Sequence, residues 1–508
     1  MLYFAFWVLT QQAGHNKLRI LVFLLRGMIM GKQTRREFIR MMGITAASAG
    51  VSSLLPGFTG IGRARGTGAN RPNIIFILAD DLGYGDLGCY GQKTIQTPNI
   101  DKMAAEGMRF SDHYSGSTVC APSRCCLMTG LHTGHALIRG NGGVPLRPSD
   151  VTVAELLKQA GYTTGIIGKW GLGEPETTGI PNRQGFDYWF GYLNQRHAHN
   201  YYPEYLWRNE EKVELANEVN HIIGGRDRTP GGVATKRVEY SHDLFSAEAL
   251  NFVEQNKDRP FFLYLAYTIP HANNEAGQKG MEVPSLEPYA DMDWPEPQKG
   301  HAAMITRMDG DIGRLLTRLE ELGLEGNTFV MFSSDNGPHK EGGANPSFFN
   351  SSGPLNGYKR ALYEGGIRVP AIARWPGKIE AGSVSGHVSA FWDFLPTCCE
   401  LVGAAVPEGI DGISMVPTLL GQDFNQQKHE FLYWEFHEQG KKQAVRMGDW
   451  KGVRLNVAKD PDGPIELYNL KHDIGEKNNV AARYPKTAAK IEGYMKTAHT
   501  PSEHWPMP

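Results

Sequence analysis

A continuous apolar run at residues 73–78 constrains the fold most, because it ends almost directly on two carboxylates, Asp80 and Asp81. An uninterrupted apolar strand is typical of the interior of a parallel sheet, where helices cover both faces. A second apolar run, at residues 328–332, leads in the same way to Asp335. Since ligands bind at the carboxyl ends of parallel strands, these acidic residues are candidate site residues.

The pattern between and around these runs alternates strand and helix. Short apolar segments predict two further strands, and apolar residues at helical spacing predict three helices. This alternation predicts an α/β sandwich around a large, mainly parallel central sheet. The predicted strands are residues 163–167 and 260–266, and the predicted helices are residues 100–107, 149–161 (capped by Ser149 and Asp150) and 305–319.

The pattern changes near residue 425, after which short strands follow one another closely. They predict a small antiparallel sheet with one helix packed on it. The expected organisation is a leader at 1–70, a catalytic α/β domain at 71–425 and a C-terminal subdomain at 426–508. The predicted strands of that subdomain are residues 431–436, 443–447, 450–455 and 466–468, and its helix is residues 484–498.

The bulk composition excludes several classes of protein. The 508 residues carry a net charge of −2, and no basic stripe suggests a nucleic-acid partner. Four of the six cysteines form two adjacent pairs, and neighbouring cysteines rarely bridge each other. Neither a disulfide framework nor a zinc site is therefore expected.

The leader resembles a twin-arginine export signal at residues 34–40, which contain Arg35 and Arg36. A mild apolar stretch follows at residues 41–55, with a small-residue cleavage site near Ala64. The alternative is a chance Arg-Arg pair on an amphipathic helix. The pattern predicts the twin-arginine export machinery as a partner, a periplasmic or secreted location, and no integral membrane span.

The segment at residues 120–130 carries the most specific motif of the chain. It begins Cys120-Ala121-Pro122-Ser123-Arg124 and closes on Leu127-Met128-Thr129-Gly130. This motif resembles the maturation signature of the formylglycine-dependent sulfatases. The resemblance extends from Arg71 to about Pro485 and implies an alkaline-phosphatase-like fold. Further segments that match the family in order are residues 72–86, 97–101, 185–192, 333–337 and 359–368.

The resemblance implies a role for each matching residue. A formylglycine-generating enzyme would oxidise Cys120, whose hydrated aldehyde would be the nucleophile and a metal ligand. Arg124 would hold the aldehyde and the metal site, and Asp335 would be the base. The remaining implied roles are sulfate binding by Lys169 and Lys359, and general acid catalysis by His271.

The expected metal ion is calcium. Asp80, Asp81, Asp335 and Asn336 offer hard oxygen donors, which calcium prefers, and no competing set of cysteine and histidine ligands is present. Three carboxylates gathered without a cation would raise one another's pKa values. Taken singly, each of these pairs is also compatible with a turn or a helix cap.

The chain departs from the family at two positions. Cys125 stands where Ser or Ala is usual, and because cysteine is also small we expect maturation to survive. Gly171 stands where the family commonly has the histidine that assists sulfate elimination. The polar stretch at residues 195–203 contains Arg196, His197 and His199, which either supply a replacement imidazole, contact the substrate or lie in a solvated loop.

These observations predict an exported, calcium-dependent sulfatase acting on a sulfated carbohydrate. The prediction of a carbohydrate substrate rests on the expected export and on aromatic residues suited to stacking on sugar rings. One alternative is a phosphate or phosphonate ester hydrolase of the same superfamily. The other is an inactive protein that binds sulfated glycans, which the loss of histidine at Gly171 suggests. The aromatic residues are Tyr201, Tyr202, Tyr205, Trp207 and Trp294.

Overall fold

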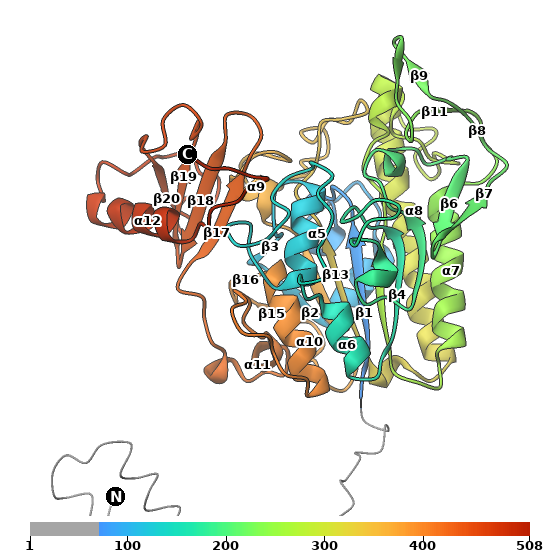
Figure 1. Cartoon of the computed structure of the whole chain (residues 1–508), viewed down its shortest axis with the longest axis horizontal. Helices are drawn as coiled ribbons and strands as arrows, with labels where there is room; N and C mark the ends of the chain where they lie inside the picture. Colours follow the sequence, from blue (N-terminus) through green and yellow to red (C-terminus); the bar gives the residue numbers. More distant parts are fainter. Residues whose placement is uncertain (1–70) are drawn as a thin grey trace, which may run out of the picture. The chain divides into compact units, whose positions relative to one another are not determined.

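The computed structural model describes residues 71–508, so the predicted leader at 1–70 lies outside the described residues. A ten-stranded sheet runs through the α/β part of the chain, as Figure 1 shows. Its strands, in spatial order, are β15 (Ser383–Ser385), β2 (Met108–Phe110), β14 (Ala371–Arg374), β13 (Thr328–Ser334), β1 (Asn73–Ala79), β12 (Phe261–Ala266), β4 (Thr163–Lys169), β5 (Tyr188–Tyr192), β6 (Tyr205–Arg208) and β7 (Glu211–Glu214).

The sheet is mixed: its parallel centre is flanked by antiparallel pairs, and the edge strand β15 is again parallel to β2. The five neighbours β13, β1, β12, β4 and β5 are parallel. By contrast, β14 is antiparallel to β13 and β2, and β6 is antiparallel to β5 and β7. Antiparallel neighbours need no crossover helix, so the short β6 and β7 extend the sheet through a tight turn. The four strands predicted for the α/β domain all lie in this parallel centre.

Strand β1 explains why the first apolar run is uninterrupted. Successive side chains of a strand point to opposite faces of its sheet. Phe76 and its alternate neighbours pack against one group of helices, and Ile77 and its neighbours against another. The first group comprises α5 (Cys120–Thr129), α6 (Val153–Gln159) and α10 (Phe394–Val402), and the second α4 (Pro98–Ala105), α7 (Ser241–Gln255) and α8 (Glu296–Glu321).

One helix begins later than expected. The predicted cap at Ser149 and Asp150 is wrong, because α6 starts after Thr152. The Thr152 side chain accepts from the backbone N–H of Glu155, whose carboxylate in turn accepts from the N–H of Thr152. This reciprocal capping box satisfies two of the free N–H groups of the first turn.

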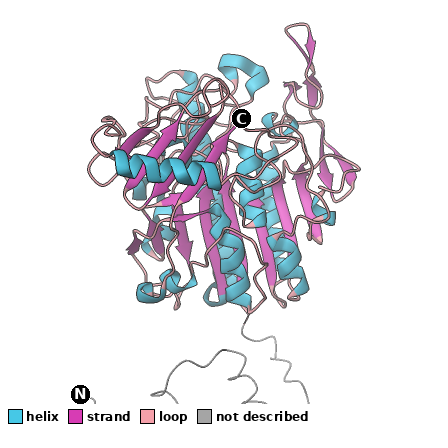
Figure 2. Ribbon diagram, turned by 60° about the vertical axis from the view of Figure 1, so that its left-hand side comes forward, coloured by secondary structure: helices cyan, strands magenta, loops and turns pink. Residues whose placement is uncertain are grey.

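The C-terminal part is a four-stranded antiparallel sheet, as predicted. Helix α12 (Pro485–Thr497) lies across one face, as Figure 2 shows, and buries Ile491 and Met495 against Val445 and Leu467. The proposed domain boundary near residue 425 stays a prediction. The strands are β17 (Leu432–Phe436), β18 (Lys442–Met447), β19 (Trp450–Arg454) and β20 (Glu466–Asn469).

The remaining elements are short. Two brief helices, α9 (Glu364–Ile367) and α11 (Val416–Leu419), lie among the loops. Three two-stranded sheets complete the structure: β3 (His113–Tyr114) with β16 (Ser389–Ala390), β8 (Glu218–Asn220) with β11 (Val233–Lys236), and β9 (Ile222–Ile223) with β10 (Arg226–Asp227).

Two further expectations concern the whole described part. All six cysteines are free thiols, which agrees with the absence of a disulfide framework. Among residues 71–508, no helix combines the length and the apolar character that crossing a bilayer requires.

A buried ion cluster joins the C-terminal sheet to the α/β part. Lys451 of β19 lies 2.8 Å from a Glu364 oxygen of α9 and 3.4 Å from Glu476, and all three side chains are fully buried. The ammonium group therefore separates two carboxylates that would otherwise repel each other inside the protein.

We expect Lys451→Ala to lower the free energy of unfolding by about 3–5 kcal/mol, because it leaves the buried Glu476 carboxylate without a cation and leaves Glu364 paired with Arg368 alone. Urea denaturation followed by circular dichroism measures this change. Lys471→Ala, at an exposed lysine of the same C-terminal part, is the matched control and should shift stability by less than about 0.5 kcal/mol. Equal stability of the two variants would contradict the role assigned to Lys451.

Candidate active site

The site lies where four neighbouring parallel strands end. In register, Ala79 of β1 pairs with Ser334 of β13, so the residues that follow these strands emerge side by side. On the other side of β1, β12 leads to His271, and β4 beyond it ends on Lys169. The sheet thus gathers the acidic and basic candidates at one edge.

Helix α5 brings Cys120 to this edge at its first residue. Val119 before it is extended, and Gly130 ends the helix in the left-handed conformation, with φ of 71°. All ten residues of α5 are buried. The sequence pattern does not predict this helix, because a helix buried on every side has no amphipathic period.

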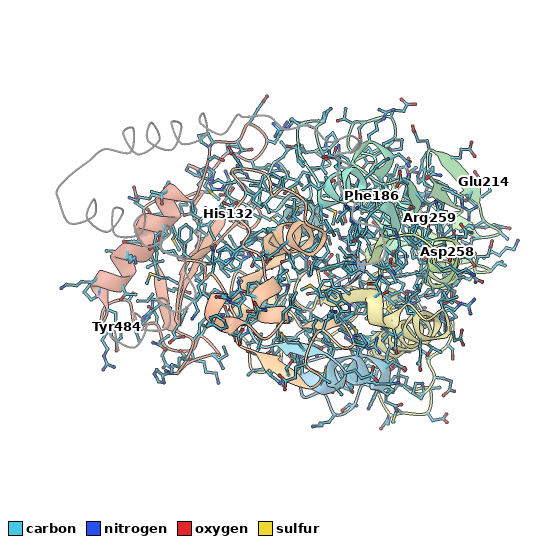
Figure 3. All side chains as sticks on the ribbon, turned by 90° about the horizontal axis from the view of Figure 1, so that it is seen from below. His132, Phe186, Glu214, Asp258, Arg259 and Tyr484 are labelled. Carbon is cyan, nitrogen blue, oxygen red and sulfur yellow. The ribbon has the colours of Figure 1, made fainter. Side chains whose placement is uncertain are left out.

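The C-terminal sheet supports α5 at both ends. Trp434 of β17 donates a hydrogen bond from its indole nitrogen to the Ser115 carbonyl, 3.0 Å away, just before the helix. Beyond the helix, His132 contacts the Tyr433 ring at 5.4 Å between centroids; Figure 3 labels His132 on the side of the C-terminal part. The position of Cys120 therefore depends on residues more than 300 positions away in sequence.

Cys120 lies inside a network of charges. Its Sγ is 3.6 Å from Asp80 Oδ1, while Lys169 Nζ donates to Asp80 Oδ2 at 2.6 Å. Arg124, one turn after Cys120, donates from Nε and Nη2 to Asp335 Oδ2 at 3.1 and 2.8 Å. Its Nη1 donates to the Lys169 carbonyl at 2.6 Å. The guanidinium fork thus fixes α5 to the ends of both β13 and β4.

A second set of contacts surrounds Asp81. Its backbone is in the left-handed region, with φ of 67°, and its N–H donates to Asp335 Oδ1 at 3.1 Å. Asn336 Nδ2 and Lys359 Nζ each donate to the Asp81 carboxylate at 2.7 Å. A non-glycine residue held in this strained conformation is typical of functional sites.

His271 lies in a stack of three imidazoles. Its ring centroid is 4.9 Å from that of His199 and 5.9 Å from that of His339, with near-parallel planes. Its Nδ1 donates to the Ala272 carbonyl at 2.7 Å, so Nε2 accepts from Lys359 Nζ at 3.0 Å. Lys359 Nζ therefore carries the hydrogen of this bond, and His271 Nε2 accepts it.

Burial and charge shift the pKa values of these groups in different directions. Burial raises the pKa of the Asp335 carboxyl to about 7, the nearby Asp80 charge adds to this, and Arg124 opposes it. Burial also acts to raise the pKa of Asp80, but Lys169 and other cations outweigh it and hold the pKa well below its usual range. Burial and then Lys359 lower the pKa of His271 to about 3. Burial raises the pKa of the Cys120 thiol.

The acidic residues form a candidate metal centre. Ligand atoms of Asp80, Asp81, Cys120 and His271 all lie within 4.8 Å of one another. Asp335 and Asn336 border this group through their hydrogen bonds to Asp81. The Asn336 Oδ1 atom is buried without a hydrogen-bond partner, and an oxygen in this state is a ready ligand for a cation. The donor set therefore fits a hard divalent ion.

The three candidates on the 195–203 stretch lie in different environments. His199 reaches the site, since it stacks on His271 and its Nδ1 lies 3.1 Å from Glu275 Oε2. His197 packs instead between Tyr192 and Tyr205, with ring centroids at 4.9 and 4.5 Å. Arg196 is exposed. Of these three, His199 is the one whose side chain contacts a predicted catalytic residue.

Two of the aromatic residues expected to stack on sugars are core residues instead. Tyr201 is fully buried and Tyr202 nearly so. The Tyr201 hydroxyl donates to the backbone carbonyls of Thr268 and His271, so it holds the loop that carries His271. The aromatic pattern alone does not distinguish a tyrosine that supports the site from one that lines it.

The sequence analysis missed three acidic and imidazole groups of the site. Glu341 Oε2 accepts from Lys359 at 3.1 Å, and its Oε1 accepts from Arg360 at 2.5 Å. Glu275 orients His199, and His339 completes the imidazole stack. His339 and Glu341 lie on a loop and Glu275 in a short 3-10 helix (Asn274–Lys279), and neither kind of segment carries a periodic signal. The short spacing of His339 and Glu341 after Asp335 is the one available hint.

Comparison with known proteins decides the family. The family model described as Sulfatase matches residues 72–404, well over half of the chain, and these residues include every predicted catalytic position. The chain belongs to the sulfatase family. It is a sulfuric ester hydrolase with the alkaline-phosphatase-like fold. A second model, described as N-sulphoglucosamine sulphohydrolase, C-terminal, matches residues 357–499.

Named sulfatases match this enzyme over most of its length. Arylsulfatase A of Homo sapiens is 34% identical over 451 residues, covering 81% of this chain and 84% of the relative. N-acetylgalactosamine-6-sulfatase of Rattus norvegicus is 35% identical over 404 residues, covering 74% and 72%. The crystal structure of Ps i-CgsB in complex with k-i-k-neocarrahexaose has a TM-score of 0.70 and 30% identity, covering 84% of this chain and 92% of that one.

The two histidines should respond differently to replacement by alanine. His199→Ala removes a partly buried side chain beside His271 that we expect to contact the substrate, so KM for a sulfate ester should rise up to about tenfold, with a smaller effect on kcat. His197→Ala leaves a cavity between two aromatic rings and should lower stability by about 2 kcal/mol. Steady-state kinetics and thermal denaturation of both variants check this pair. A larger kinetic effect in His197→Ala would contradict the assignment.

Proposed function

We propose that this sulfatase is exported, matures by oxidation of Cys120 to formylglycine, and hydrolyses sulfate esters of carbohydrates with calcium at its acidic centre. The observation that carries the proposal is the position of Cys120, at the start of a buried helix and 3.6 Å from Asp80. Around it lie the carboxylates and cations that sulfate transfer requires. The twin-arginine pattern supports a periplasmic or secreted location, with oxidation of Cys120 before export.

The unmodified thiol is poorly suited to be the nucleophile. Nucleophilic cysteines are thiolates with a lowered pKa, whereas burial raises the pKa of Cys120. The hydroxyl oxygens of Ser117 and Thr118 are also buried without partners just before Cys120, which suits a more polar group at this position. Once formed, a formylglycine hydrate supplies one hydroxyl for attack on sulfur and a second through which sulfate is expelled.

The acidic centre fits calcium because its negative charges lie on carboxylate oxygens, the hard donors that calcium prefers. Calcium bound there would neutralise the carboxylates and polarise sulfate oxygens. Asp80, Asp81, Asp335 and Asn336 would hold it. The ammonium groups of Lys169 and Lys359 now contact Asp80 and Asp81. Since a bound cation competes for the same oxygens, both lysines would become available to bind the sulfate group.

The remaining roles follow from the contacts of each side chain. Arg124 orients Asp335, which acts as the base of the site. Lys359 Nζ donates to His271 Nε2, and this pair supplies the proton for the leaving oxygen. Burial of all these groups excludes water and strengthens their electrostatic effect on the developing charge.

A sulfated carbohydrate is the substrate class best supported by the relatives. One acts on a sulfated N-acetylgalactosamine by name, and a solved structure holds a neocarrahexaose. Arg196, the exposed residue of the largely buried 195–203 stretch, offers a charge for a second anionic group. The alternative activity is hydrolysis of a phosphate or phosphonate ester. Comparing kcat/KM for an aryl sulfate with kcat/KM for the matched aryl phosphate distinguishes the two activities.

The Cys120 peptide should lose about 18 Da, the mass change from thiol to aldehyde, when the chain is co-expressed with a formylglycine-generating enzyme. Peptide mass spectrometry measures it. Cys120→Ser should be nearly inactive when that enzyme is the sole route of maturation, whereas Cys125→Ser, on the same helix, should keep activity. A fully active preparation with an unmodified Cys120 thiol would falsify the proposal.

Removing calcium should lower both activity and melting temperature, because the buried carboxylates then repel one another. Calcium returned to the chelated enzyme should raise the melting temperature by an amount that grows with its concentration. Asp335→Ala should abolish that rise, while Asp462→Ala, at an exposed carboxylate, should keep it. A calcium-dependent rise of normal size in Asp335→Ala would show that the ion binds elsewhere.

A further inference from the structure

A cavity of about 260 Å³ opens beside the nucleophile position. Ala121, which directly follows Cys120, lines it, and the Ala121 N–H donates to Asn141 Oδ1 at 3.0 Å. The loops that follow β4 and β5 form two further walls, and residues of the 138–144 and 229–230 segments complete the lining. We call this the Gln195 cavity; its lining includes Ala121, Gly171, Glu174, Asn194, Gln195 and Arg196.

The cavity owes its shape to a close contact between Gly171 and Gln195. Gly171 has φ of 79°, and a Cβ added there would lie 1.9 Å from Gln195 Nε2. The Gln195 amide therefore occupies the space that a side chain at residue 171 would fill. Any larger residue at position 171 would have to displace this amide.

The Gln195 amide is an unused hydrogen-bonding group. Its Nε2 atom is buried and has no partner, which costs free energy in the free enzyme. The terminal amide torsion of glutamine is soft, so a small rotation turns the group towards the cavity. A ligand oxygen in the cavity would then recover the missing hydrogen bond.

The other polar groups of the cavity suit hydroxyls and a negative charge. Asn194 Oδ1 accepts from the backbone N–H groups of Arg196 and His197, which fixes the loop, and Asn194 Nδ2 donates to Glu174 Oε1 at 2.7 Å. The Arg196 side chain is exposed at the edge of the cavity. The volume is below the roughly 300–1,000 Å³ of pockets for drug-sized ligands, so it fits a single ring.

We propose that Gln195 is a specificity-determining residue, and that the Gln195 cavity binds a hydroxyl-bearing ring of the sulfate ester. The ring belongs to a saccharide, whose hydroxyls bond to the Gln195 amide and Glu174, while Arg196 meets a neighbouring anionic group. This inference rests on the proposed function, because the cavity is a substrate subsite only if Cys120 is the position of the nucleophile. The lack of a side chain at Gly171 is what makes room for Gln195.

Competition kinetics test the subsite. Para-nitrophenyl sulfate, whose ring carries no hydroxyl, reports turnover, and N-acetylgalactosamine 6-sulfate and D-glucosamine 2-N,6-O-disulfate are the competing probes. We expect Gln195→Ala to raise the inhibition constant of the sugars about three- to tenfold relative to the KM of the aryl ester, which is the worth of one hydrogen bond. An unchanged ratio in a folded Gln195→Ala enzyme overturns the proposal.

A double-mutant cycle tests whether Gln195 fills the space at residue 171. Gly171→Ala should raise the same ratio in the wild-type background, because the new methyl group displaces the amide. In the Gln195→Ala background it should add no more than Gly409→Ala, a control glycine with the same φ of 79° and nothing within 4 Å of an added Cβ. Additive effects of the two substitutions overturn the shared-space argument.

The outcomes separate this proposal from the proposed function. Wild-type enzyme that hydrolyses the aryl sulfate but is not inhibited by either sugar keeps the sulfatase assignment and overturns the saccharide subsite. Enzyme with oxidised Cys120 that hydrolyses no sulfate ester overturns the proposed function itself. Melting temperatures of all variants show whether each is folded, and Gly171→Ala replaces Gln195→Ala if the latter is not.

Discussion

The repulsion among three buried carboxylates is the constraint on which the rest of the site depends. Asp80, Asp81 and Asp335 are brought together by the parallel register of β1 and β13 and cannot move apart without breaking the sheet. Each therefore needs a nearby positive charge, and Arg124, Lys169 and Lys359 supply it. Such an arrangement is costly for stability, and its retention is understandable where the same charges bind and polarise a sulfate ester.

The C-terminal sheet takes part in this arrangement although it contributes no predicted catalytic residue. Trp434 supports the chain before α5, and Lys451 pairs with Glu364 in the segment that follows Lys359. Arg360, next to Lys359, bridges Glu341 in the site and Glu438 of the C-terminal part. The C-terminal sheet thus contacts both the segment before α5 and the segment after Lys359, so changes far from the sulfate group can affect its binding.

The loops around the sheet edge give this sulfatase its individual features. Gly171 leaves room for Gln195, while His199 covers His271 and is itself oriented by Glu275. An amide does not titrate near neutral pH, so the side chain over Gly171 serves to bind rather than to transfer protons. In the imidazole stack, by contrast, the His199 ring lies on the face of His271, and His271 accepts a hydrogen bond from Lys359. The segment between β5 and β6 thus carries both Gln195, for recognition, and His199, for the imidazole stack, while His271 lies on the loop after β12.

The sequence by itself determined the parallel centre of the sheet and the acidic residues at its edge. Short, uninterrupted apolar runs are compatible with few structures other than strands buried on both faces. Strands β1, β12, β13 and β4 all lie where the pattern predicted them. The Cys120–Arg124 motif fixed the family because its residue types and spacing are unusual. The short C-terminal strands were also predictable, because each is a strand-like segment bounded by turns.

The tertiary structure decided what depends on contacts between distant segments. A helix buried on all sides, such as α5, has no period to read, and Tyr201 supports the site rather than lining it because its hydroxyl meets the carbonyls of Thr268 and His271. The roles open to His197 and His199 could not be separated by sequence, since neighbouring residues on a loop can face opposite ways. In the sequence, Gly171 indicates only that a side chain usual in the family is absent. The fold brings the loop after β5 against Gly171, and Gln195 occupies the space that this side chain would fill.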